Sequence, residues 1–184
     1  MSLPDSARER AASVRALVLD VDGVLTDGTL FYGPDGEAMK SFSARDGLGV
    51  RLLRLEGIAV AVISAKRSSA LLARLRDLDI TNAYLGREDK LAALDELAAA
   101  LSLSPTEMAY AGDDLVDLPV MAAVGLPIAV ADAHPRVRAR AAWVTEARGG
   151  HGAVREIAES LLEARGRLDA ACEALARAIS RRRA

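Results

Sequence analysis

Acidic, hydroxyl and ammonium side chains follow the apolar runs of this chain at the positions where strands would end. The residues concerned are Asp20, Asp22, Ser64, Lys90, Asp113 and Asp114. In an open parallel sheet, ligands bind beyond the carboxyl ends of the strands, so these side chains would share one location. That shared location predicts a single site with several carboxylates and one cation.

A phosphoryl group fits such a site. Several carboxylates at short range repel one another unless a hard cation lies among them, and few-carboxylate oxygen sites suit Mg²⁺. A lysine and a serine hydroxyl would bind the anion, and phosphoryl transfer depends mainly on positioning and charge neutralisation. One carboxylate can attack phosphorus and form an acyl phosphate. Residues two apart in an extended segment point the same way, so Asp20 and Asp22 can face one substrate, with Asp22 as the acid/base group.

The elements that must position these residues alternate between strand and helix. We predict strands over 16–19, 58–63, 82–85, 108–111, 128–131 and 143–144. We predict helices over 46–56, 68–78, 88–101, 115–124, 135–141, 154–164 and 168–179. This alternation favours an α/β fold, a Rossmann-like parallel sheet with helices on both faces. The turn signal Gly33-Pro34-Asp35-Gly36 predicts a β-hairpin flap over about 27–42.

Length and composition narrow the class of protein. The 184 residues suit one domain over 1–184, with a core over about 15–163 and a C-terminal helical tail over about 166–184. The net charge of −2 gives no reason to expect a nucleic-acid partner. One cysteine fits a reducing compartment, and the longest uncharged run, 118–131, is too short to span a membrane. We therefore expect a cytoplasmic protein without a membrane partner.

The segment 20–28, Asp-Val-Asp-Gly-Val-Leu-Thr-Asp-Gly, resembles the first motif of the haloacid dehalogenase superfamily of phosphohydrolases. Ser64 matches the second motif of that superfamily, Lys90 the third, and 112–117, Gly-Asp-Asp-Leu-Val-Asp, the fourth. The order and spacing agree over about 15–163. The chain is thus identified as a member of the capless subclass, in which a small flap replaces a separate cap domain.

The resemblance implies a role for each matching residue. Asp20 would be the nucleophile, Asp22 the acid/base residue that also lends its backbone carbonyl to Mg²⁺, and Asp113 the residue that completes the metal site. The residues implied to hold the transferring phosphoryl group are Ser64 and Lys90, and the supporting carboxylates are Asp114 and Asp117. The resemblance further implies a homotetramer in which the hairpin makes subunit contacts and a neighbouring subunit covers the open site.

The closer resemblance is to capless members that dephosphorylate 2-keto-3-deoxy sugar acids, above all an octulosonate 8-phosphate. The segments 44–49, 89–91, 130–135 and 152–156 carry it. The chain departs from those enzymes at Ala65-Lys66, where they have Gly-Arg, and at His151, where they have Arg. Candidate substrate-binding residues are Arg45, Lys66, Arg74 and His151. A nonulosonate 9-phosphate is the alternative substrate.

Two other classes of protein stay open on the sequence. A signalling receiver domain also places carboxylates, a hydroxyl and a lysine on a parallel sheet, but its acceptor Asp follows the third strand, and no Asp ends 58–63 here. A non-catalytic assembly module could keep the fold and the tetramer without the chemistry. The complete set of motifs favours the phosphatase over both, and over a phosphomutase, which would usually need a cap.

Overall fold

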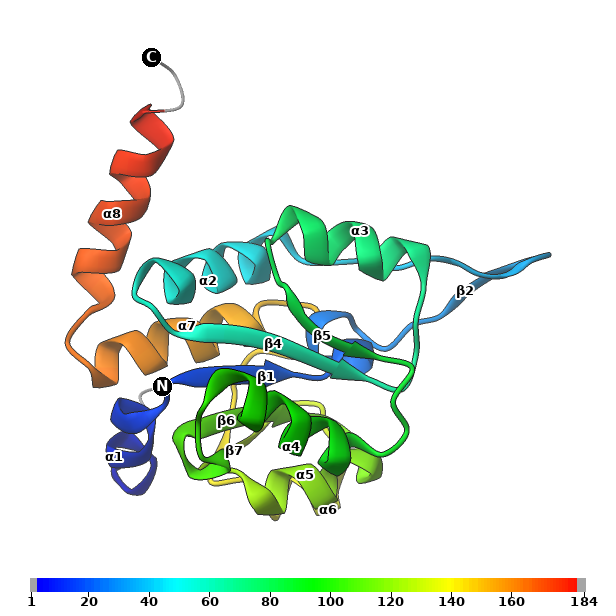
Figure 1. Ribbon diagram of the computed structural model, residues 1–184, viewed down its shortest axis with the longest axis horizontal. Coiled ribbons are helices and arrows are strands. Elements are labelled where there is room, and N and C mark those ends of the chain that lie inside the picture. The colour runs from blue at the N-terminus through cyan, green and yellow to red at the C-terminus, as the bar shows by residue number, and fades with distance from the viewer. Residues whose placement is uncertain (1–2, 182–184) are drawn as a thin grey trace.

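A six-stranded parallel sheet forms the centre of the computed structural model, which describes residues 3–181 (Figure 1). Its strand order is β5-β4-β1-β6-β7-β8. The strands are β1 (Ala16–Leu19), β4 (Ala59–Ser64), β5 (Asn82–Leu85), β6 (Met108–Gly112), β7 (Leu126–Ala129) and β8 (Trp143–Val144). The order reverses between β4 and β6 on either side of β1, so the carboxyl ends of these three strands form the crevice where such folds bind ligands.

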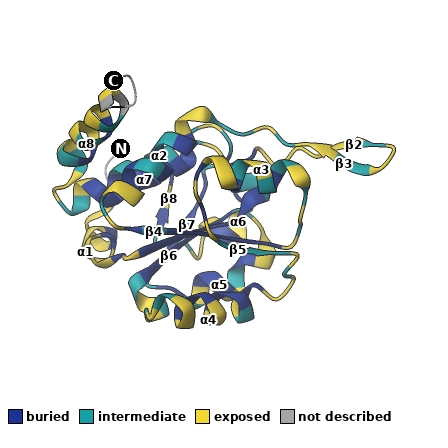
Figure 2. Cartoon of the chain, turned by 45° about the horizontal axis from the view of Figure 1, so that its top comes forward, coloured by how far each residue is buried: buried dark blue, intermediate teal, exposed yellow. Residues whose placement is uncertain are grey.

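Helices cover both faces of the sheet. In Figure 1, α2, α3 and α7 lie on one side of the strands and α4 and α5 on the other. The helices are α1 (Asp5–Ser13), α2 (Ala44–Leu55), α3 (Ser69–Asp77), α4 (Lys90–Leu101), α5 (Leu118–Ala123), α6 (Pro135–Arg138), α7 (Ala153–Ala164) and α8 (Leu168–Arg181). Every residue of β1, β6 and β7 is buried, as continuous apolar strands between two helical layers should be (Figure 2). The predicted α/β fold is confirmed.

The hairpin that was predicted after the first strand is present. It consists of β2 (Phe31–Gly33) and β3 (Gly36–Met39), paired antiparallel, and it projects away from the sheet (Figure 2). The tight turn needs a residue with positive φ, and Gly36 supplies it at +106°. Several apolar side chains on the hairpin remain solvent-exposed, among them Tyr32 at 69% and Met39 at 59%.

The structure departs from the predicted elements at several places, and it contains one helix that was not predicted. The segment 115–124 is a 3₁₀ turn, Leu115–Asp117, followed by α5, because Asp114 and Asp117 form a capping box that closes the tighter turn first. β7 begins two residues before the predicted 128, and α6 ends at Arg138. Helix α1 was not predicted, because its buried stripe against α7 consists only of alanines, Ala7 and Ala11.

No helix within residues 3–181 combines the length and apolar character that crossing a membrane requires. Residues 182–184 of the predicted tail lie outside the described part of the chain.

Candidate active site

The loop after β1 turns sharply around a glycine. The amide of Asp20 donates to the carbonyl of Ala111 at 3.0 Å, which extends the β1–β6 ladder as far as Asp20. The chain then enters one wide turn, Val21–Leu25, in which Gly23 has a φ of +96°. A Cβ at Gly23 would collide with the carboxylate of Asp113. Glycine is therefore required at position 23 for two reasons: the backbone conformation and the close approach of Asp113.

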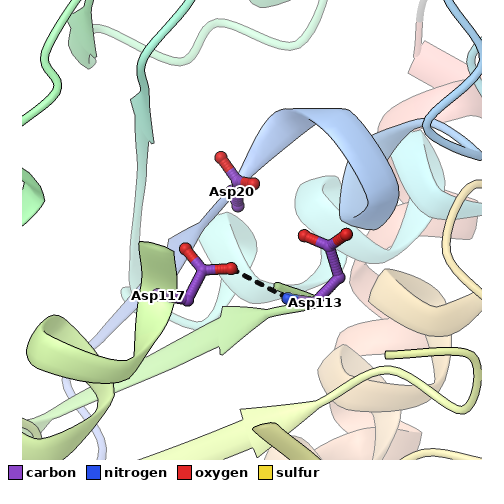
Figure 3. A group of neighbouring side chains, drawn as sticks. All are labelled: Asp20, Asp113 and Asp117. Carbon is purple, nitrogen blue, oxygen red and sulfur yellow. Dashed lines mark hydrogen bonds between the residues drawn. The ribbon is translucent and has the colours of Figure 1, made fainter. Parts of the chain in front are cut away.

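Three carboxylates from two strand ends converge beside this loop. Oxygen atoms of Asp20, Asp113 and Asp117 all lie within 4.8 Å of one another (Figure 3). Lys90, at the start of α4, places its Nζ 2.9 Å from Oδ1 of Asp20 and 2.7 Å from Oδ1 of Asp117. Three carboxylates thus face one ammonium group, and when all three are ionised two negative charges are left uncompensated. A divalent cation would balance them.

Asp117 supports the site and has no free oxygen to offer a metal. Its Oδ1 accepts from Lys90 Nζ and from the hydroxyl of Tyr110, each at 2.7 Å. Its Oδ2 accepts from the backbone amides of Asp113 at 2.9 Å and Asp114 at 3.2 Å. An ionised carboxylate offers about four lone-pair positions, and all four are used. Asp117 is also fully buried, so it fixes the segment that carries Asp113.

Burial and mutual repulsion raise the pKa values of the other two carboxyl groups. Burial, together with the charge of Asp117, raises the pKa of Asp20 to about 6, although Lys90 opposes the shift. Burial and the charges of Asp20 and Asp117 raise the pKa of Asp113 to about 8. Burial alone would lower the pKa of Lys90, but Asp20 and Asp117 raise it. The cluster therefore has too little positive charge to balance its carboxylates.

These donors fit a hard divalent cation. Asp20 and Asp113 present carboxylate oxygens that can serve as ligands, and oxygen ligands are those that Mg²⁺ prefers. A Zn²⁺ site would need nitrogen or sulfur ligands, and among the described residues no histidine or cysteine belongs to this group. The donor set therefore fits Mg²⁺, held by one or two carboxylates with water completing its shell.

Asp22 faces an ion-pair partner that sequence reasoning missed. Its Oδ1 contacts Nζ of Lys40, which follows β3 of the hairpin. The same ammonium lies 3.1 Å from Oε2 of Glu37. The only signal in the sequence was the predicted hairpin, which brings residue 40 back over the loop after β1. From sequence alone, a lysine at that position is indistinguishable from an ordinary surface lysine.

All the residues predicted to do chemistry line one hollow of about 290 Å³. Its polar lining is Asp20, Asp22, Ser64, Lys66, Lys90, Asp113 and Asp114, and Leu30 and Val116 form apolar edges. Ser64 is buried, and its hydroxyl accepts from the amide of Lys66 at 3.1 Å. A larger hollow of about 780 Å³ lies between α1, α5 and α6, but no carboxylate lines it. The chemistry therefore belongs to the smaller one.

The other candidate substrate-binding residues lie outside that hollow. Arg45 and His151 line a second hollow of about 430 Å³, together with Phe42. The amide of Gly150 donates to Val24 at 2.9 Å, so the loop that carries His151 packs on the loop after β1. Arg74 donates to the carbonyl of Ser43 at 2.9 Å and its guanidinium lies 5.7 Å from the centre of the Phe42 ring. These contacts give Arg74 a structural use at the start of α2.

Comparisons with known proteins identify relatives over nearly the whole chain. Residues 53–157 match the family model described as haloacid dehalogenase-like hydrolase. A 3-deoxy-D-manno-octulosonate 8-phosphate phosphatase from Yersinia pestis is 48% identical over 167 residues, which cover 91% of this chain and 89% of the relative. The crystal structure of the Yersinia pestis phosphatase superposes with a TM-score of 0.88 over 90% of this chain and 89% of that chain.

A second solved structure is a 3-deoxy-D-manno-octulosonate 8-phosphate phosphatase from Moraxella catarrhalis, in complex with a magnesium ion, a phosphate ion and a KDO molecule. It is 34% identical to this chain and has a TM-score of 0.89, covering 93% of this chain and 98% of that chain.

Proposed function

The chain belongs to the haloacid dehalogenase-like hydrolases, and from this premise we propose that it is a Mg²⁺-dependent phosphatase that forms an aspartyl-phosphate on Asp20. The proposed substrate is a phosphorylated 2-keto-3-deoxy sugar acid, 3-deoxy-D-manno-octulosonate 8-phosphate. The observation that carries the proposal is the cluster of three carboxylates around one buried ammonium at the carboxyl ends of β1 and β6.

The residues of the cluster suit two successive displacements. In the first, an oxygen of Asp20 bonds to phosphorus while the bond from phosphorus to the sugar oxygen breaks, and Asp22 gives that oxygen a proton. In the second, Asp22 takes a proton from water as the water oxygen bonds to phosphorus, and the bond to Asp20 breaks. Lys90 and Ser64 hold the phosphoryl oxygens through both steps.

Mg²⁺ would be held by Asp20, Asp113 and the backbone carbonyl of Asp22. When bound, it neutralises charge on the phosphoryl oxygens. Asp117 and Asp114 keep the segment of Asp113 in place. A covered site would favour this chemistry by excluding water.

The named relatives support the proposed substrate. The Yersinia pestis and Moraxella catarrhalis proteins are phosphatases of this octulosonate phosphate by name, and the first of them is 48% identical to this chain. Lys66 lines the acidic hollow, and Arg45 and His151 line the hollow that contains Phe42. These three residues are therefore proposed to bind the sugar acid. Lys66 and His151 differ from the family pattern, so a nonulosonate 9-phosphate is the second candidate substrate.

The test is phosphate release from both sugar acid phosphates, with Mg²⁺ and with chelator. We expect Mg²⁺-dependent turnover, a loss of at least about 10³-fold in Asp20→Asn, and a phosphoprotein trapped on Asp20 in the wild type. Asp95→Asn, an exposed carboxylate on α4, is the matched control and should keep wild-type activity. Turnover that survives in Asp20→Asn would sink the mechanism. A preference of about tenfold or more for the nonulosonate phosphate would change the proposed substrate and leave the proposed mechanism unchanged.

We also propose that the enzyme works as a homotetramer in the cytoplasm. Leu30, Phe31, Tyr32 and Met39 expose apolar surface on the projecting hairpin, which is the kind of patch that subunit contacts cover. Light scattering that gave a monomer at assay concentrations would contradict the tetramer. Tetramers without any Mg²⁺-dependent turnover would instead favour the non-catalytic assembly module.

A further inference from the structure

Lys40 is a buried ammonium on an otherwise exposed hairpin. Only 1% of its side chain is accessible, whereas the neighbouring Met39 is 59% exposed. Its Nζ contacts Asp22 from the loop after β1 and Glu37 from β3. Burial alone would lower the pKa of Lys40, but these two carboxylates raise it, so the group is a full cation. An ammonium is buried in this way only where carboxylates compensate it.

Glu37 extends this contact to the loop after β4. Burial alone would raise the pKa of Glu37, but the neighbouring Ser68 and Lys40, with the charge of Lys66, lower it. Ser68 caps α3, and Lys66 lines the acidic hollow. The ion pair of Lys40 with Asp22 therefore ties the hairpin to the loop after β1, and Glu37 is influenced by the loop after β4. The hairpin, although it projects, has its base anchored on Asp22.

We propose that Lys40 is a positioning residue for the acid/base step, because it fixes where the carboxyl group of Asp22 lies. The inference rests on the proposed function. A short aspartate on a loop has several rotamers. The contact with Lys40, supported by Glu37, selects one of them. No other ion pair of Asp22 is present among residues 3–181.

A positioning role predicts which chemical step suffers. Asp20 attacks phosphorus without help from Lys40, since its own ammonium partner is Lys90. Departure of a sugar alkoxide needs the proton of Asp22, and hydrolysis of the aspartyl-phosphate needs Asp22 as a base. Departure of p-nitrophenolate needs little protonation. With p-nitrophenyl phosphate, loss of Lys40 should therefore spare the first step and slow the second.

The experiment is rapid-mixing kinetics of the Mg²⁺-loaded full chain and its Lys40→Met variant with p-nitrophenyl phosphate. We expect a burst of about one p-nitrophenolate per active site, with a rate constant within about threefold of wild type, followed by a steady state lowered by about 10- to 100-fold. With the sugar acid phosphate, the first turnover itself should slow by a similar factor. Asp35→Asn at the exposed hairpin tip is the control and should behave as wild type.

The competing explanation is a merely structural role. In that case the burst amplitude and the steady-state rate of Lys40→Met would fall by the same factor, which would overturn the proposal, as would rates within about threefold of wild type for both substrates. If Lys40→Met does not fold, Glu37→Gln decides: a selective slowing of the second step supports the proposal, and its absence overturns it. A wild type that never phosphorylates Asp20 would overturn the proposed function as well.

Discussion

Replacing Asp117 by asparagine tests how the acidic cluster is held together. The change keeps the size of the side chain and removes one charge. All four groups around Asp117 donate to it: Lys90 and Tyr110 to one oxygen, and the amides of Asp113 and Asp114 to the other. Asparagine has one acceptor oxygen. If it faces the two amides, its NH₂ group meets the Lys90 ammonium, which cannot accept a hydrogen bond.

Two opposing contributions determine how much unfolding free energy Asp117→Asn loses. Losing a hydrogen bond between charged groups costs about 1.5–3 kcal/mol of unfolding free energy. Removing one of three carboxylates within 4.8 Å relieves repulsion of about 1–3 kcal/mol per pair for effective dielectric constants between those of the protein surface and water. Bound Mg²⁺ already neutralises that repulsion. The loss of stability in Asp117→Asn should therefore be about 2–3 kcal/mol in Mg²⁺ and under about 1 kcal/mol in chelator.

The assay is urea unfolding of wild type and Asp117→Asn at about pH 8, with saturating Mg²⁺ and with EDTA. Tyr110→Phe is the matched control: it removes one donor and keeps the charge, so it should cost about 1 kcal/mol in both conditions. No loss of stability for Asp117→Asn in Mg²⁺ would refute the hydrogen-bond reasoning. An equal loss in both conditions would refute the reasoning from charge.

Three further predictions concern the metal affinity, the pH dependence of stability and the loop after β1. Because the folded pKa of Asp113 is about 8, a proton competes with Mg²⁺ below that pH, and calorimetry should find Mg²⁺ affinity falling by about 10- to 100-fold from pH 8 to pH 6. The raised pKa values of Asp20 and Asp113 also mean that the metal-free protein binds more protons folded than unfolded. These two groups should therefore lower its stability as the pH rises from about 4 to 8, and thermal melts showing the reverse over that range would contradict the assignment. Gly23→Ala should cost at least about 1–3 kcal/mol and nearly all Mg²⁺-dependent activity, since its φ is +96° and its Cβ would displace Asp113. Gly36→Ala is the control: its φ is +106°, and an added Cβ would have no atom within 4 Å, so it should show only the cost in backbone conformation. If Gly36→Ala and Gly23→Ala lowered activity equally, the steric argument would be refuted.

The sequence was informative wherever a strand ended. A buried apolar strand stops at the first residue that cannot be buried alone, so Asp20 and Asp113 marked the carboxyl ends of β1 and β6 and hence one shared site. The fold class followed from the same alternation. The roles of these residues remain predictions, and the geometry brings together the ones that carry the proposed chemistry.

The partners of those residues were harder to predict, because they depend on how distant segments pack. Lys40 reaches Asp22 only because the hairpin folds back on the loop after β1. Tyr110 looked like another apolar residue of β6, although its hydroxyl donates to Asp117. The alanine stripe of α1 gave no signal, since its burial comes from packing against α7 and not from its own apolar character.

The raised pKa values of Asp20 and Asp113 distinguish the two carboxylates from each other. Near pH 7, pKa values of about 6 for Asp20 and about 8 for Asp113 mean that the metal-free pair holds about one proton, more on Asp113 than on Asp20. Lys90 accounts for the difference, because it contacts Asp20 directly. The proposed nucleophile is therefore the more ionised of the two carboxylates before the metal binds, and the proton that Mg²⁺ must displace lies mainly on Asp113. Metal binding near neutral pH should accordingly release about one proton, and calorimetry in buffers of different ionisation enthalpy should measure it.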